Sequence, residues 1–221
     1  MERVPEPELM DDPAQARAYA EADFSEPHEL FVRAFGERLG PPAGPVADLG
    51  CGPADVTLRF ARAWPSVAID AVDGAAAMLE LARAAVARAG LQGRIRLLAG
   101  RIPGAALPGA PYRTVISNSL LHHLRDPLDL WRTIRRIAAP GAAVFVMDLM
   151  RPRDEAEWAR LVDTYAAGAP PLLRRDFRAS LAAAYRPREV EAQLAAAGIG
   201  RTLRVEVLSD RHLAVWGRLQ V

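Results

Sequence analysis

Residues 46–55 read VADLGCGPAD, and this stretch decides the fold. The apolar residues at its start predict a short buried strand over 46–49, and the apolar spacing over 56–61 predicts a helix. Gly50 and Gly52 lie between the two elements. Glycine adopts positive φ without steric cost and, lacking a Cβ, lets a ligand touch the backbone. Because a helix start adds unpaired N–H groups and partial positive charge, we expect a ligand to lie against bare backbone at this strand end.

The spacing of the glycines narrows the class of ligand. Dinucleotide-binding turns carry glycine at the first, third and sixth positions, and here the sixth position is Asp55. A carboxylate at that place would repel a pyrophosphate held at the helix start. A phosphate-binding P-loop requires a lysine, and the chain contains none. The pattern therefore favours a nucleoside ligand without phosphates.

The same stretch closely resembles motif I of the class I S-adenosylmethionine (SAM) dependent methyltransferases, written D-x-G-x-G-x-G. Asp48, Gly50 and Gly52 match it, and Ala54 stands at the last glycine position. The resemblance covers about residues 40–221. It implies an α/β, Rossmann-like, doubly wound fold, in which a seven-stranded sheet is mostly parallel, its last strand is antiparallel, and helices cover both faces. It also implies SAM as the cofactor.

A second acid follows at the end of the next predicted strand. Asp73 lies 23 residues after Gly50, near the spacing at which a carboxylate reaches a ribose in such folds. A carboxylate accepts two donors at once, which suits the two ribose hydroxyls. Capping of the following helix is an alternative role for Asp73 that is compatible with the first. Asp70 precedes the strand end, so we expect it not to contact the ligand.

The resemblance implies further cofactor contacts after the third and fourth strands. The family usually has an acid for the adenine amino group where this chain has Arg101, so the backbone N–H of Ile102 and the stem of Arg101 are the expected adenine contacts. Asn118 and Leu120 sit where the family holds the methionine part of SAM. The complete set of predicted cofactor-binding residues is Asp48, Gly50, Cys51, Gly52, Asp73, Gly74, Met78, Arg101, Ile102, Asn118 and Leu120.

A Leu-His-His segment, followed by Asp-Pro, comes after the fourth predicted strand and resembles the ubiquinone and menaquinone type of methyltransferase. Two adjacent histidines on a regular element are not expected to face one site. We therefore interpret His123 as structural and His122 as a candidate catalytic residue on the acceptor side, although a packing role for His122 stays open. Tyr19, in the N-terminal helical segment, is the second candidate catalytic residue.

The chain is expected to consist of an N-terminal helical segment (1–40) and a SAM-binding domain (41–221), joined by a stiff proline-rich connector. Residues 1–12 are expected to be loosely ordered. The helical segment either packs on the sheet edge or acts as a lid whose aromatic residues close over the cofactor. In this family an insert after the fifth strand shapes the acceptor pocket, and here it would be a cap at about 151–185.

Three arginines of this cap bear on the charge of the acceptor. Arg174, Arg175 and Arg178 either lie on solvated helix faces or point inward. Guanidinium groups that point inward would indicate a carboxylate or another anion on the acceptor. An anionic acceptor is thus expected only with the inward arrangement.

Composition bounds the class of protein. The 221 residues, of which 51% are hydrophobic, suffice for the core of one domain, and a net charge of +1 offers no field that would attract nucleic acid. The single cysteine, Cys51, fits a reducing compartment and has no partner at zinc spacing, so we expect a cytoplasmic protein without a metal site. No apolar run approaches the ~18 residues of a membrane span.

We therefore expect an enzyme that transfers the SAM methyl group to a small-molecule acceptor. A methyltransferase acting on tRNA or protein is one alternative, but it would call for a basic stripe or an appended domain. A SAM-binding protein without catalytic activity is another. A dinucleotide-dependent oxidoreductase is disfavoured by Asp55. The sequence leaves the acceptor atom and the oligomeric state open.

Overall fold

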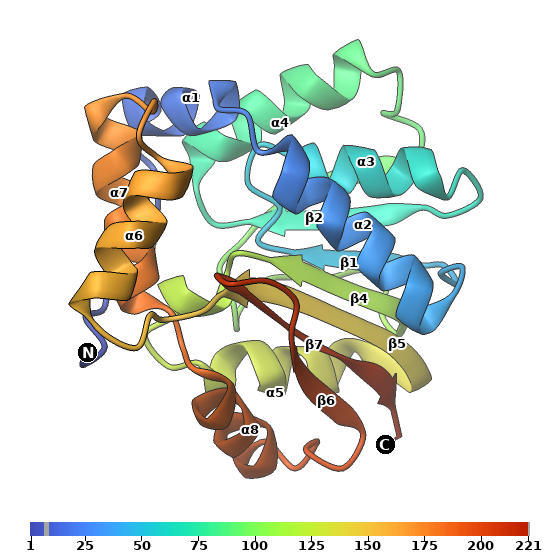
Figure 1. Ribbon diagram of the computed structural model, residues 1–221. Coiled ribbons are helices and arrows are strands. Elements are labelled where there is room, and N and C mark those ends of the chain that lie inside the picture. The colour runs from blue at the N-terminus through green and yellow to red at the C-terminus, as the bar shows by residue number, and fades with distance from the viewer. Residues whose placement is uncertain (7–8, 221) are drawn as a thin grey trace.

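The computed structural model describes residues 1–6 and 9–220 and is built on one seven-stranded sheet (Figure 1). The strands are β1 (Val46–Leu49), β2 (Ile69–Asp73), β3 (Ile95–Ala99), β4 (Tyr112–Asn118), β5 (Ala138–Leu149), β6 (Leu203–Val207) and β7 (His212–Leu219). Their order is β3-β2-β1-β4-β5-β7-β6, and within the described sheet β7 runs in the opposite direction to the other six strands. The predicted Rossmann-like sheet is confirmed.

Helices cover both faces of this sheet (Figure 1). They are α1 (Pro13–Glu21), α2 (Ser25–Leu39), α3 (Asp55–Ala63), α4 (Ala76–Arg88), α5 (Leu128–Ile137), α6 (Glu155–Tyr165), α7 (Pro171–Ala183) and α8 (Pro187–Ala196), with one 3₁₀ turn, η1 (Leu121–His123). Among the helices of the described residues, none combines the length and apolar character that crossing a membrane requires.

Strand β5 illustrates why two helical layers are needed. Val144 and Val146 belong to the core cluster that contains the buried residues of α5 and α8. Phe145, between them, belongs to the cluster formed with α2, α3 and α4. Side chains alternate along a strand, so a strand that is apolar at successive positions must be buried on both faces.

The strand order reverses between β1 and β4. From β1 the chain proceeds outward through β2 and β3 and then returns to the other side of β1 as β4. The parallel register pairs Asp48 with Ile116, so the carboxyl ends of β1 and β4 adjoin. In doubly wound sheets, ligands bind in the crevice outside such a reversal.

The N-terminal segment and the insert after β5 reach these strand ends. Helix α1 packs on α4 and α7, and Figure 1 shows it beside the upright pair α6 and α7. Helix α2 instead belongs to a helical layer, because Phe31 and Phe35 pack on Phe145 with ring centroids 5.0 and 5.9 Å apart. Both N-terminal helices therefore reach this end of the sheet, α1 through Tyr19 and α2 through its first turn at residues 26–28.

Candidate functional site

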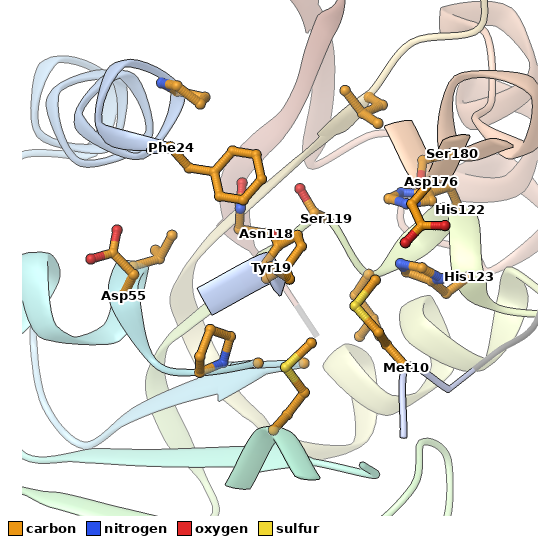
Figure 2. A pocket seen from close by; sticks show the side chains of 18 of the residues that line it. Met10, Tyr19, Phe24, Asp55, Asn118, Ser119, His122, His123, Asp176 and Ser180 are labelled. Carbon is orange, nitrogen blue, oxygen red and sulfur yellow. The ribbon is translucent and has the colours of Figure 1, made fainter. Parts of the chain in front are cut away.

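A cavity of about 640 Å³ lies at the carboxyl ends of the strands, where the order reverses. All thirteen residues predicted for the site line it: Tyr19, Asp48, Gly50, Cys51, Gly52, Asp73, Gly74, Met78, Arg101, Ile102, Asn118, Leu120 and His122. In Figure 2, Tyr19 and Asn118 lie near the middle, Asp55 lies on one side, and the histidines gather with residues of α7 on the other. The structure thus brings the predicted set together, while the role of each member stays a prediction.

The glycine turn after β1 has the backbone geometry that the sequence predicts. Gly50 and Gly52 have φ of +75° and +52°. A Cβ on Gly50 would stand 2.9 Å from the side chain of Leu120, whereas a Cβ on Gly52 would meet nothing within 4 Å. The space beside Gly52 therefore admits a ligand in direct contact with the backbone, as a nucleoside cofactor would require.

Asp73 both supports this turn and faces the cavity. Its Oδ2 accepts a hydrogen bond from the Gly52 N–H and its Oδ1 accepts one from the Ala75 N–H, each at 2.8 Å. Burial raises the pKa of Asp73 above its ordinary value. Each carboxylate oxygen has a second lone pair, so the two ribose hydroxyls of a nucleoside can still be accepted.

Asp48, the acid of motif I, is buried and turned toward α3. Its Oδ2 accepts a hydrogen bond of 2.6 Å from the Thr57 hydroxyl. Burial raises the pKa of Asp48 to about 7, and the negative charge of Asp73 adds to the effect. This carboxyl group therefore ties β1 to α3 at the edge of the site.

Two further groups mark where polar and apolar parts of a ligand fit. Asn118 Oδ1, at the end of β4, is buried without a hydrogen-bond partner among the described residues. Such an acceptor costs about 1–3 kcal/mol unless a donor reaches it, so it suits a ligand amino group. On the other side of β1, the stem of Arg101 lies against Gly74, where a Cβ would stand 3.0 Å from Arg101 Cγ.

Asp55 and Cys51 contribute an anion and a thiol to the cavity wall. His28 Nδ1 lies 2.6 Å and Arg59 Nε 2.8 Å from Asp55 Oδ2. Although burial favours the neutral acid, these two partners outweigh it and hold the pKa of Asp55 at about 2. Burial raises the pKa of the Cys51 thiol well above its ordinary value, so it is no nucleophile at neutral pH.

The expectation that adjacent histidines could not face one site was wrong. His122 and His123 both line the cavity, and their rings lie 4.2 Å apart with a 35° tilt. They belong to a single 3₁₀ turn, which lacks the strict alternation of a strand. Both rings also approach one carboxylate oxygen, Glu6 Oε1, at 3.3 Å from His122 Nε2 and 3.2 Å from His123 Nδ1.

His122 is buried between two carboxylates. Its Nδ1 lies 2.5 Å from Asp148 Oδ1, on β5, and its Nε2 faces Glu6. Burial lowers the pKa of His122, but the charges of Asp148 and Glu6 outweigh it, so the pKa is raised overall. Both ring nitrogens are thus engaged by side chains of the protein.

The described residues just before Glu6 are held in place, contrary to the loose order expected for residues 1–12, of which 7–8 lie outside the described residues. The Arg3 guanidinium donates to the carbonyls of Ala183, at 2.6 Å, and of His122, at 3.0 Å. Val4 N–H donates to the carbonyl of Ala182. Glu6 itself gave no signal in the sequence, because it lies far along the chain from His122 and His123.

Tyr19 and the cap arginines also acquire definite positions. The Tyr19 ring packs on Phe24 with centroids 4.7 Å apart, and burial raises the pKa of its phenol to about 12, so it stays protonated at neutral pH. Arg174 pairs with Asp163, Arg175 pairs with Asp176, and Arg178 stacks on Trp158. None of these three arginines lines the cavity, so the inward arrangement that would have indicated an anionic acceptor is not found.

Comparison with known proteins agrees with this geometry. Residues 46–141 match a family model described as a methyltransferase domain. The matched stretch runs from the start of β1 into the first residues of β5 and is similar to that methyltransferase family. An uncharacterized methyltransferase of Mycobacterium tuberculosis is 35% identical over 107 residues, which make up 48% of this chain and 51% of that protein. The chain thus spans about half the length of the first curated relatives that it matches.

Two further similarities extend beyond the methyltransferase domain. A ubiquinone biosynthesis O-methyltransferase of Pseudomonas aeruginosa is 27% identical over 182 residues, covering 81% of this chain and 75% of that protein. The crystal structure of a SAM-dependent methyltransferase from Aquifex aeolicus superposes with a TM-score of 0.68 at 19% identity, covering 94% of this chain and 98% of the other. The similarity to the Aquifex aeolicus structure supports the fold of this chain.

Proposed function

We propose that this chain binds SAM in the cavity and transfers its methyl group to a small-molecule acceptor. The observation that carries the proposal is the crevice where the strand order reverses, in which the open backbone at Gly52 lies beside the Asp73 carboxylate and the unpartnered Asn118 Oδ1. The methyltransferase domain supports it, and so do relatives that are named as methyltransferases of small molecules.

The residues of the crevice fit the parts of SAM one by one. Asp73 would accept the ribose hydroxyls, and the Ile102 N–H with the Arg101 stem would meet the adenine. Asn118 Oδ1 would accept a hydrogen bond from the amino group of the methionine part. Leu120, whose side chain packs against Gly50, would limit how closely the cofactor approaches this part of the turn.

The chemistry asked of the protein is mainly positioning. When bound, SAM supplies a methyl group that its sulfonium already activates. The cavity walls then have to hold the acceptor atom in line behind the methyl carbon, and such positioning can lower a barrier by ~7–11 kcal/mol. Phe24, Leu173 and Phe177 offer apolar surface for this purpose, with Asp176 and Ser180 as polar groups. About 640 Å³ must hold cofactor and acceptor together, which favours a small acceptor over a macromolecule.

Ligand-dependent melting tests the cofactor. SAM and S-adenosylhomocysteine are each expected to raise the Tm, because a ligand at 100 times its Kd stabilises the native state by about 2.7 kcal/mol. NAD is expected to leave the Tm unchanged. Asp73→Ala should abolish the shift, whereas Asp163→Asn, on an exposed part of α6, should retain it. A shift with NAD alone would overturn the proposal, and an intact shift in Asp73→Ala would remove the ribose role.

The acceptor is then sought with labelled SAM. The full chain is incubated with SAM carrying a labelled methyl group and, in separate reactions, with the small-molecule, RNA and protein fractions of a cell extract. We expect the label to move into a small molecule. Label that appears in the RNA or protein fraction instead would contradict the assignment of the acceptor class and leave the cofactor assignment standing.

A further inference from the structure

We propose that Glu6, His122 and His123 form a binding site for a divalent transition-metal ion, with zinc as the best match. The three side chains bring one carboxylate oxygen and two imidazole nitrogens within 4.8 Å of one another. They come from the N-terminal segment and from η1, and both histidines line the cavity. The spacing of residues in the sequence gave no sign of such a site, because Glu6 lies far from the histidines along the chain.

The distances favour metal ligands over directly bonded partners. Glu6 Oε1 lies 3.3 Å from His122 Nε2 and 3.2 Å from His123 Nδ1. A charge-assisted N–H···O bond is shorter, about 2.7–2.9 Å. In a tetrahedral zinc site with bonds of about 2.0–2.1 Å, neighbouring ligand atoms stand about 3.3–3.4 Å apart. The two distances from the Glu6 oxygen therefore match those between ligands arranged around a shared ion.

Hydrogen bonds from neighbouring residues orient His122 and Glu6, as is usual for metal ligands. His122 Nδ1 faces Asp148 Oδ1, which leaves Nε2 as the nitrogen directed at the site. The Ser180 hydroxyl donates to Glu6 Oε1 at 3.1 Å. Metal-bound histidines commonly donate their other N–H to a carboxylate, and metal-bound carboxylates are themselves hydrogen-bonded.

The charge of the cluster also favours a cation. The side chains of Glu6 and Asp148 are only 10% and 2% exposed, and they flank the same imidazole. Buried carboxylates are normally paired with cations or coordinate metal ions. One divalent ion would offset both charges.

The donor set favours a transition-metal ion and leaves room for a further ligand. Two imidazoles and one carboxylate match zinc, and they also match iron(II), whereas Mg²⁺ and Ca²⁺ prefer oxygen ligands alone. Three protein ligands leave the fourth tetrahedral position open, as in catalytic zinc sites. Figure 2 shows His122 and His123 beside Asp176 and Ser180 of α7, on the opposite side of Tyr19 from Asp55. The open position would therefore be available to water or to an oxygen atom of the acceptor.

Equilibrium dialysis of the full, untagged chain against Zn²⁺ alone tests the site without SAM or acceptor. We expect one zinc per chain by elemental analysis, and Co²⁺ in its place should give the visible absorption of a four- or five-coordinate ion. Glu6→Gln and His123→Asn should each weaken zinc binding on the order of 100-fold or more, since even the loss of an outer contact costs about 10–100-fold.

Matched variants in the same cavity serve as controls. Glu26→Gln alters a cavity glutamate paired with Arg211, and His28→Asn alters a cavity histidine paired with Asp55. Both should bind zinc as the unchanged chain does. The far-UV circular dichroism and the SAM-dependent Tm shift of Glu6→Gln report folding and cofactor binding separately from the metal. Absence of zinc binding by the unchanged chain at micromolar zinc, or unchanged binding by Glu6→Gln, would overturn the proposal.

Discussion

At the scale of single residues, Ala54 is the position where the chain departs from the glycine pattern of motif I. Its backbone has φ of +70°, and no side-chain cap bonds the start of α3. An L-residue with a Cβ pays roughly 1–2 kcal/mol in this left-handed region, and glycine does not. Ala54 is also buried, and loss of its methyl group offsets part of this gain. We therefore expect Ala54→Gly to raise the free energy of unfolding by at most about 1 kcal/mol, or the Tm by at most about 2–4 °C for a chain of this size.

The control for this substitution is an alanine in ordinary helical conformation. Ala84 is exposed in the middle of α4, where exchange for glycine costs about 1 kcal/mol. Thermal melting of Ala54→Gly and Ala84→Gly should therefore give shifts of opposite sign. A decrease in Tm for both would show that the conformation of Ala54 is not the source of strain.

Asp48 predicts a pH dependence of stability. Its folded-state pKa of about 7 lies above the ordinary value of 3.8, so the folded state binds the proton more tightly than the unfolded chain does. The stability that this carboxyl group contributes is fully present below about pH 4 and is lost as the pH rises toward 7. Asp48→Asn keeps an acceptor for Thr57 and cannot ionise.

Denaturant unfolding of both chains between pH 4 and pH 8 measures this effect. As the pH rises, we expect the free energy of unfolding of Asp48→Asn to increase relative to that of the unchanged chain, by at most about 4 kcal/mol. One pKa unit corresponds to about 1.4 kcal/mol. Asp129→Asn, at a solvent-accessible carboxyl group on α5, is the matched control substitution. If the free energies of unfolding of Asp48→Asn and of the unchanged chain change with pH in the same way, the carboxyl group is not protonated in the folded state.

At the scale of elements, α1 contributes an aromatic side chain to the cavity. Tyr19 packs on Phe24, a pairing worth about 0.5–1.5 kcal/mol, and its phenol stays protonated at neutral pH. If the ring rather than the hydroxyl matters, Tyr19→Phe should retain the affinity for S-adenosylhomocysteine. Tyr19→Ala should lose up to about tenfold. Calorimetric titration distinguishes the two, and equal loss in both variants would assign the role to the hydroxyl.

The elements also show where prediction from sequence succeeds. The glycine turn, Asp73 and the ends of β1, β2 and β4 could be placed in advance, because each depends on residues that are close together in the chain. The direction of Arg174 could not, since it depends on which face of α7 docks on the rest of the molecule. The same limit applies to Asp148, whose partner His122 lies on a different element.

At the scale of the whole molecule, the site is assembled from segments that lie far apart in the chain. Residues 1–6 cross to α7 and η1, and α1 rests on α4 and α7. No pattern within one segment could have predicted that Glu6 meets His122, because this contact exists only after the insert has folded over the strand ends. The half of the site that faces the cofactor was therefore predictable, and the half near the histidines was not.

This assembly predicts how a cofactor affects distant segments. We propose that α1 and α7 close over the cavity, which places segments far apart in sequence around one ligand. Hydrogen exchange of the full chain should then slow on addition of S-adenosylhomocysteine in the turn over 50–55 and also in α1 and α7. Helices α5 and α8, which pack on each other and contribute no residue to the described cavity wall, serve as internal controls and should exchange at unchanged rates. Slowing confined to the turn would mean that the cofactor binds without engaging α1 and α7, and the N-terminal segment would then have no lid function.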